Sequence, residues 1–76
     1  MNPVVMPKMG ITMESAKIVS WYKKVGDAVK QGEELFEIET EKSDIPVESP
    51  YTGILKEIVV PEGEEADVDA ILAYIE

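Results

Sequence analysis

The protein has 76 residues, no cysteine and a formal net charge of −9 at pH 7. A chain of this length forms one small domain, and without cysteine it has neither a disulfide nor a thiolate metal site. The acidic excess excludes the usual nucleic-acid binder, which neutralises phosphates with Lys and Arg, and it disfavours an anionic membrane surface. It favours basic protein partners. The N-terminus lacks a secretory signal pattern, so we expect a cytoplasmic protein.

The first β-prone segment is Val4-Val5-Met6, which lies between two prolines. Proline donates no hydrogen bond to a ladder, so Pro3 and Pro7 are expected to mark the ends of this strand. The loop over 8–15 follows. Its methionines and isoleucine are expected to pack over one end of the core, with an adaptable contact surface as the alternative.

The next strand is predicted over 16–23 and contains the only tryptophan, Trp21. We expect this side chain to anchor the core and its ring N–H to find a hydrogen-bond partner.

Residues 35–50 are predicted to form a β-hairpin with Lys42 at its tip. Two apolar-rich runs flank the polar centre Thr40-Glu41-Lys42-Ser43-Asp44. No Asn-Gly or Asp-Gly is present, so a type I turn is favoured over a primed turn. Taken alone, the hairpin favours an ordinary solvated lysine, because long charged side chains usually lie at the surface.

An internal repeat appears when the chain is shifted by 37 positions. Gly26 then falls on Gly63, Leu35 on Leu72 and Ile38 on Ile75. Trp21 falls on another apolar residue, Ile58. Residues 64–73 have helical propensity, but the first copy has Gln31-Gly32 in the same place, which suits a turn. The repeat therefore predicts two short strands and a turn instead of a helix.

Each copy also places two apolar residues three positions apart, Ile18 and Trp21 in the first and Leu55 and Ile58 in the second. Strict alternation would put them on opposite faces of a strand. A β-bulge at the same place in both halves lets both face inward, so the repeat predicts a pair of bulges.

The resulting fold class is all-β. We expect one domain over 1–76, a flattened β-barrel or sandwich of two antiparallel sheets with pseudo-twofold symmetry. The symmetry places the Lys42 hairpin at one end of the molecule and both termini near the other. A tether at one end and a presented amine at the other suit a carrier.

Four blocks of the sequence, at 6–14, 18–21, 26–29 and 32–43, carry a resemblance that runs from Met6 to Glu76. Their order and spacing resemble the lipoyl domain of the dihydrolipoamide acyltransferase (E2) component of a 2-oxo acid or acetoin dehydrogenase complex, which implies a barrel-sandwich hybrid fold. Three positions depart from the family pattern. Glu41 and Ser43 flank the lysine where Asp and Ala or Val are usual, and Ala16 stands where Gly is common. These departures bear on partner preference.

The resemblance implies that Lys42 carries lipoic acid as an amide on a swinging arm. The arm would move acyl groups and reducing equivalents between a thiamin-diphosphate-dependent decarboxylase (E1), the acyltransferase core (E2) and dihydrolipoyl dehydrogenase (E3), after loading by a lipoate-attaching enzyme. Recognition by these partners is expected around the lysine and in the 8–15 loop, at Thr40, Glu41, Ser43, Asp44, Met9, Gly10, Ile11 and Thr12. The chain is expected to be the N-terminal fragment of a larger acyltransferase, monomeric as an isolated domain.

Neither a catalytic residue nor a metal site is predicted. The chain has no histidine and no cysteine, and its serines have no evident base. Lys42 and Ser43 are neighbours in a tight turn, where two side chains seldom aim together, so a Ser–Lys pair is not favoured. The carboxylates around 33–41 lack the spaced-ligand loop of a calcium site.

Two other functions compete with a lipoyl carrier. A biotin carboxyl carrier resembles this fold, but its lysine sits between methionines, whereas Glu41 and Ser43 flank Lys42 here. An unmodified structural or adaptor module of the same shape is the third possibility, and that class often lacks the lysine signature.

Overall fold

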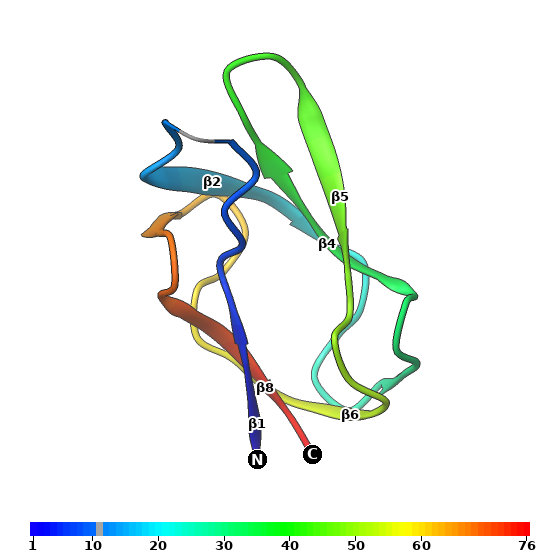
Figure 1. Ribbon diagram of the computed structural model, residues 1–76. Coiled ribbons are helices and arrows are strands. Elements are labelled where there is room, and N and C mark those ends of the chain that lie inside the picture. Colours follow the sequence, from blue (N-terminus) through cyan, green and yellow to red (C-terminus); the bar gives the residue numbers. More distant parts are fainter. Residues whose placement is uncertain (11) are drawn as a thin grey trace.

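The computed structural model describes residues 1–10 and 12–76, and this part of the chain forms eight strands and no helix. Figure 1 shows two layers of strands, with the β4–β5 hairpin at one end and both termini at the other. The long axis of the molecule measures 32 Å. The strands are β1 Asn2–Val5, β2 Ser15–Trp21, β3 Ala28–Val29, β4 Glu34–Glu39, β5 Asp44–Glu48, β6 Gly53–Ile58, β7 Glu65–Asp67 and β8 Ile71–Ile75.

The two sheets are antiparallel and four-stranded, with the orders β1-β8-β6-β3 and β5-β4-β2-β7. The predicted all-β class and the two antiparallel sheets are therefore confirmed. The sheets are not closed into a barrel, so of the two expected architectures the sandwich is the correct one. The predicted strands over 64–76 are also confirmed, because β7 and β8 occupy the segment with helical propensity.

The two sheets have the same strand order when the halves are superimposed. By their positions in the two sheets, β1 corresponds to β5, β2 to β6, β3 to β7 and β4 to β8. The short strands are exchanged between the halves, since β3 pairs with β6 and β7 pairs with β2. Neither half forms a complete sheet from its own residues. The chain is therefore one interlocked unit.

The predicted bulges occur at matching positions. The register of β2 against β4 shifts between Ile18 and Ser20, and that of β6 against β8 shifts between Leu55 and Glu57. These shifts are 37 positions apart. Ile18 and Leu55 are fully buried, while Trp21 and Ile58 pack against the core from partly buried positions.

The buried core consists largely of residues that match across the repeat. Pairs of buried side chains 37 positions apart are Ile18 and Leu55, Val29 and Ala66, Leu35 and Leu72, Phe36 and Ala73, and Ile38 and Ile75. Trp21 packs against Phe36 with ring centroids 5.0 Å apart and the ring planes tilted by 43°, and its ring N–H donates to the carbonyl of Val60 at 3.0 Å. The expected partner for this N–H is thus confirmed, although the indole is only half-buried.

The prolines of the first strand differ from expectation. Pro3 lies inside β1, paired with Tyr74, and does not mark the end of the strand. Its counterpart Pro46 lies inside β5, paired with Glu37. Both strands are sheet edges, where the missing N–H leaves no neighbour unsatisfied. The matching sequences Pro3-Val-Val-Met-Pro and Pro46-Val-Glu-Ser-Pro are a second repeat, 43 positions apart, that the sequence analysis missed.

The turns repeat as well, with one chemical difference. Gly26 and Gly63 both have positive φ, 99° and 91°. Gly32 has φ 89°, and its counterpart Asp69 is the one non-glycine residue of the described chain with positive φ, at 73°. Aspartate tolerates this left-handed region better than most residues. Both halves therefore require the same backbone shape before their last strand.

Replacing Gly32 by alanine should reveal this requirement. An L residue in the left-handed region costs about 1–2 kcal/mol, so Gly32→Ala should lower the free energy of unfolding by about that amount in urea denaturation. Gly10→Ala is the matched control, since a Cβ there meets no atom within 4 Å and the backbone is not left-handed. Equal stabilities of the two variants would contradict the requirement.

Candidate functional site

Lys42 lies in the connection between β4 and β5, at the end of the molecule opposite the termini (Figure 1). The ladder between the two strands continues to its end, with Ile38 opposite Ile45 and Glu39 opposite Asp44. Ile38 is fully buried and Ile45 packs against the core. The hairpin is thus anchored in the core while its tip is exposed, as the sequence predicted.

Thr40 closes the tip with both its backbone and its side chain. Its N–H donates to the carbonyl of Ser43 at 3.0 Å. Its hydroxyl donates to the same carbonyl at 2.6 Å and accepts the N–H of Ser43 at 3.3 Å. In a hydrogen-bonded type I turn the N–H of Ser43 would donate to the carbonyl of Thr40. Here it donates to the Thr40 hydroxyl instead, so the turn is of the open kind. No residue of the tip has positive φ, as expected when a primed turn is absent.

Among the residues that the structure describes, the Lys42 amine has no ionic partner. Lys23 and Glu33, at 3.3 Å, form the one salt bridge found within residues 1–10 and 12–76. Glu41 is adjacent to Lys42 in sequence but forms no ion pair with it, and both side chains are exposed. An exposed and unpaired primary amine on an anchored hairpin is available to an acylating enzyme.

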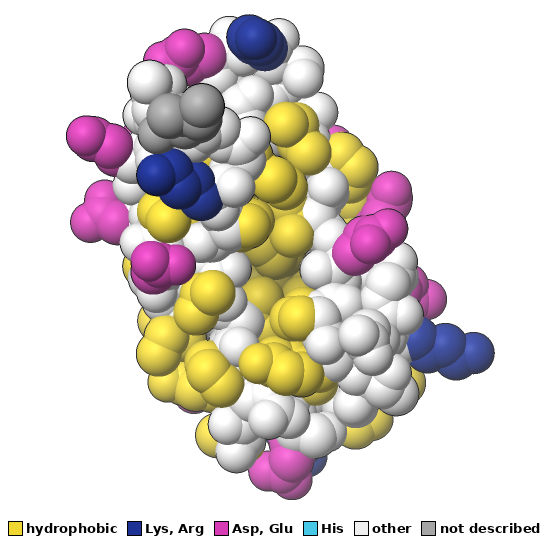
Figure 2. Space-filling model, viewed as in Figure 1, with side chains coloured by type: hydrophobic (Ala, Val, Ile, Leu, Met, Phe, Trp, Pro, Cys, Tyr) yellow, Lys and Arg dark blue, Asp and Glu magenta, His cyan; other side chains and the backbone are white. Residues whose placement is uncertain are grey.

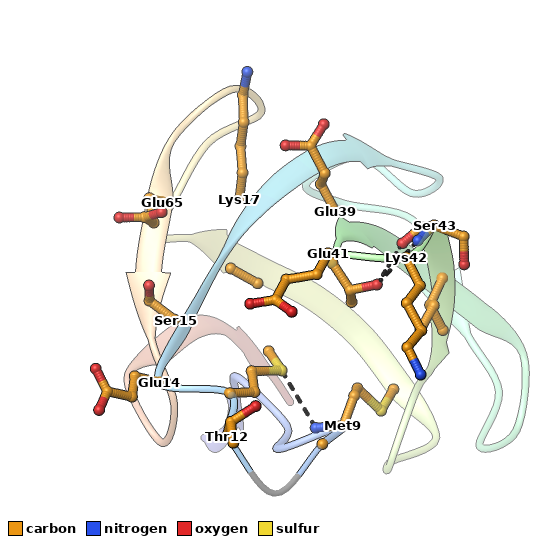
Figure 3. A pocket seen from close by; sticks show the side chains of 15 residues that line it. Met9, Thr12, Glu14, Ser15, Lys17, Glu39, Glu41, Lys42, Ser43 and Glu65 are labelled. Carbon is orange, nitrogen blue, oxygen red and sulfur yellow. Dashed lines mark hydrogen bonds between the residues drawn. The ribbon is translucent and has the colours of Figure 1, made fainter.

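A hollow of about 750 Å³ lies beside Lys42, between the hairpin tip and the segment over 9–17 (Figure 3). Its apolar lining residues Met13, Ala16 and Ile45 are buried or partly buried. Its charged lining residues are mostly carboxylates, and they are Glu14, Lys17, Glu39, Glu41, Lys42 and Glu65. The site therefore combines an apolar floor with an acidic rim.

The loop that faces the hairpin is held by contacts between its own residues. The N–H of Met13 donates to the carbonyl of Gly10 at 3.2 Å, and the N–H of Met9 donates to the Met13 sulfur at 3.3 Å. Met13 packs against the core as expected, whereas Met9 is 42% exposed. The expected core packing is confirmed for Met13 and not for Met9, and the contact surface stays a prediction. Ile11, predicted to contact partners, lies outside the described residues.

The structure brings most of the predicted recognition residues to the hollow. Met9, Gly10 and Thr12 line it from the loop, and Thr40, Glu41 and Ser43 line it from the hairpin. Asp44 does not line it and instead begins β5 opposite Glu39. The contributions of Lys17 and Glu65 were missed. They follow from the pairing of Lys17 with both Glu39 and Glu65 in the β7-β2-β4 ladder.

Within the described ranges, no cluster of three or more His, Cys, Asp or Glu residues could hold a metal ion. None of the described segments forms a helix that is long and apolar enough to cross a membrane.

Comparison with known proteins agrees with this geometry. A family model described as "Biotin-requiring enzyme", which covers biotin- and lipoyl-type domains, matches residues 2–75. The lipoyl domain of the 2-oxoglutarate dehydrogenase complex from Azotobacter vinelandii has a similar fold, with a TM-score of 0.79 and 28% identity over 100% of this chain and 96% of that one.

The curated relatives are acyltransferase components, and this chain matches a part of each. The dihydrolipoyllysine-residue acetyltransferase component of the acetoin cleaving system is 43% identical in Bacillus subtilis and 34% in Pseudomonas putida, over 95% and 97% of this chain. The succinyltransferase component of the 2-oxoglutarate dehydrogenase complex of Bartonella vinsonii subsp. berkhoffii is 39% identical over 93% of it. The matched region is 18%, 20% and 17% of these relatives, so the chain spans at most a fifth of their length.

The Thr40 hydroxyl should control the order of the tip. A neutral hydrogen bond contributes about 1 kcal/mol, so Thr40→Ala should speed amide hydrogen exchange of Ser43 by roughly fivefold. Thr40→Ser, which keeps the hydroxyl, should leave the exchange rate near that of the wild type. Thr12→Ala is the control for loss of an exposed threonine hydroxyl beside the same hollow. If Thr40→Ala exchanged no faster than Thr12→Ala, the capping role of Thr40 would be wrong.

Proposed function

Because the chain belongs to the biotin/lipoyl-attachment family and is a lipoyl domain of the kind found in acyltransferase components of acetoin and 2-oxo acid dehydrogenase complexes, we propose that Lys42 carries its lipoic acid. The observation that carries this proposal is the unpaired, exposed amine at the tip of a hairpin rooted in the core. An amide at Lys42 removes the lysine charge and breaks no hydrogen bond or ion pair of the described structure.

The residues around Lys42 fit such a group. The neighbouring side chains, Glu41 and Ser43, are both exposed, and a hollow opens directly beside the lysine. When bound, lipoic acid supplies a dithiolane that accepts an acyl group together with two electrons. The chain itself supplies the position of the arm, since the Thr40 bonds and the buried Ile38 fix where the arm begins.

We further propose that the domain performs no bond-making step. The sequence contains neither histidine nor cysteine, which removes the most common general base and the strongest nucleophile. Its contribution is effective concentration, because a tethered arm visits successive active sites without release into solution. The proposed partners are E1, the E2 core and E3, together with the lipoate-attaching enzyme, in a larger acyltransferase to which this domain belongs.

The attachment site can be tested by intact mass. Incubation with lipoate, ATP and a lipoate-attaching enzyme should add one lipoyl group to the wild type and none to Lys42→Arg. Lys17→Arg is the matched control, because Lys17 lines the same hollow and its loss should leave the adduct unchanged. An adduct that survives in Lys42→Arg would refute the site, and a biotin adduct from biotin and a biotin ligase would favour the alternative carrier.

The acidic flank should affect partner association. Replacing Glu39, Glu41, Asp44 and Glu48 by their amides should slow reductive acylation by the cognate E1 about tenfold at low salt, because charges near a contact mainly steer encounter. The difference should shrink at high salt. A panel of acetoin-, pyruvate- and oxoglutarate-type decarboxylases identifies the cognate E1.

The control for this experiment neutralises four exposed carboxylates outside the β4–β5 hairpin, Glu57, Glu62, Glu64 and Glu76, and so reaches the same net charge. If both variants were acylated at equal rates at low salt, total charge and not the flank of Lys42 would be responsible.

A further inference from the structure

The two halves of the scaffold are joined to their edge strands by connections of different length. Pro7 and Ala16 are nine positions apart between β1 and β2, whereas their counterparts Pro50 and Gly53 are three positions apart between β5 and β6. The first connection therefore contains six additional residues. The described residues of this connection that line the hollow lie at the end of the molecule that carries Lys42, and they are Met9, Gly10, Thr12, Met13, Glu14 and Ser15.

The short connection shows that the fold does not need these residues. The Ser49 hydroxyl donates to the carbonyl of Tyr51 at 2.6 Å and accepts the N–H of Tyr51 at 3.2 Å, which closes the connection within a few residues. Strands β5 and β6 have five and six residues, against four in β1 and seven in β2, so the short connection joins strands of similar length. Met13 packs against the core, but the rest of the additional residues that the structure describes are not needed for the sandwich and lie beside Lys42.

These residues give the hollow its apolar character. Met13 lies partly buried against the core, and the N–H of Met9 donates to its sulfur, so the loop holds a thioether over the floor. Ile45 closes the floor from the hairpin. Figure 3 shows Met9 extending from the loop and Lys42 from the hairpin, and both border the hollow, which Met13 also lines. A soft, apolar surface thus lies within the space that the Lys42 side chain borders.

Building on the proposed lipoylation, we propose that this hollow is the resting site of the oxidised arm. The amide removes the charge of Lys42, and the arm that remains is an apolar chain ending in a disulfide ring, whose burial is favourable. Thioether side chains adapt their shape to such a group. The rim carboxylates Glu14, Glu39 and Glu65 disfavour an anion but not this uncharged arm. When a thiol reductant such as dithiothreitol supplies two electrons and two protons, the ring opens into two thiols that are neutral at pH 7, and the compact ring held by the apolar floor is lost.

The four methionines of the chain provide the probe. In the lipoylated 76-residue chain with ¹³C-methyl methionine, we expect the methyl signals of Met9 and Met13 to shift relative to unmodified protein. Two methionines are internal controls and should not shift. Met1 is the N-terminal residue and is 66% exposed, and Met6 is fully buried. Signals of Met9 and Met13 that superimpose on those of unmodified protein would overturn the proposal.

The rate at which dithiothreitol reduces the arm provides a second measurement. Docking that removes a few methylene equivalents from water should slow reduction about tenfold relative to free lipoamide. Met9→Gln, whose side chain is exposed, and Met13→Gln should both restore faster reduction, while Ile71→Gln, away from the hollow, should not. Equal rates for wild type, Met9→Gln and free lipoamide would overturn the resting site. A chain that shows no lipoyl adduct by mass would instead refute the proposed function.

Discussion

The exchange of β3 and β7 between the two halves is the constraint on which the rest of the molecule depends. Each short strand completes the sheet of the other half, so both sheets and the core between them form together. A matched bulge in β2 and β6 turns two apolar side chains of each half inward. A small chain without disulfides thereby gains a core that can support a projecting hairpin, and the hairpin gives the amine of Lys42 a fixed starting point.

Much of this fold could be predicted because the repeat is visible in the sequence. The 37-residue repeat predicted strands over 64–73 where local propensity alone favours a helix. It also placed the bulges near Ile18 and Leu55. Lys42 could be placed at a tip because polar residues separate two apolar runs. The prediction that Pro3 ends its strand was wrong. It rested on the local sequence alone, whereas a strand tolerates an internal proline when it lies at a sheet edge, as β1 does.

The surroundings of Lys42 were less predictable. The hollow joins side chains from the 9–15 loop, β2, the hairpin tip and β7, and only the sheet order shows that these segments meet. The second hydrogen-bonding role of the Thr40 hydroxyl has no sequence signature beyond the residue itself. The unequal connections were likewise hidden until the edge strands β1 and β5 could be matched by their prolines. Long-range register, and not local propensity, decided these features.

The prolines of the edge strands have a consequence for contacts with other protein chains. Edge strands present free backbone groups to which a neighbouring chain can add a strand, and this is a common route to aggregation. Figure 2 shows that apolar side chains are widely visible on the face viewed there, so the surface is not protected by charge alone. Pro3 and Pro46 each remove a donor from the outermost strand of their sheet. A domain with such edges can meet other chains repeatedly without adding a strand to them, which is the property that the proposed carrier role requires.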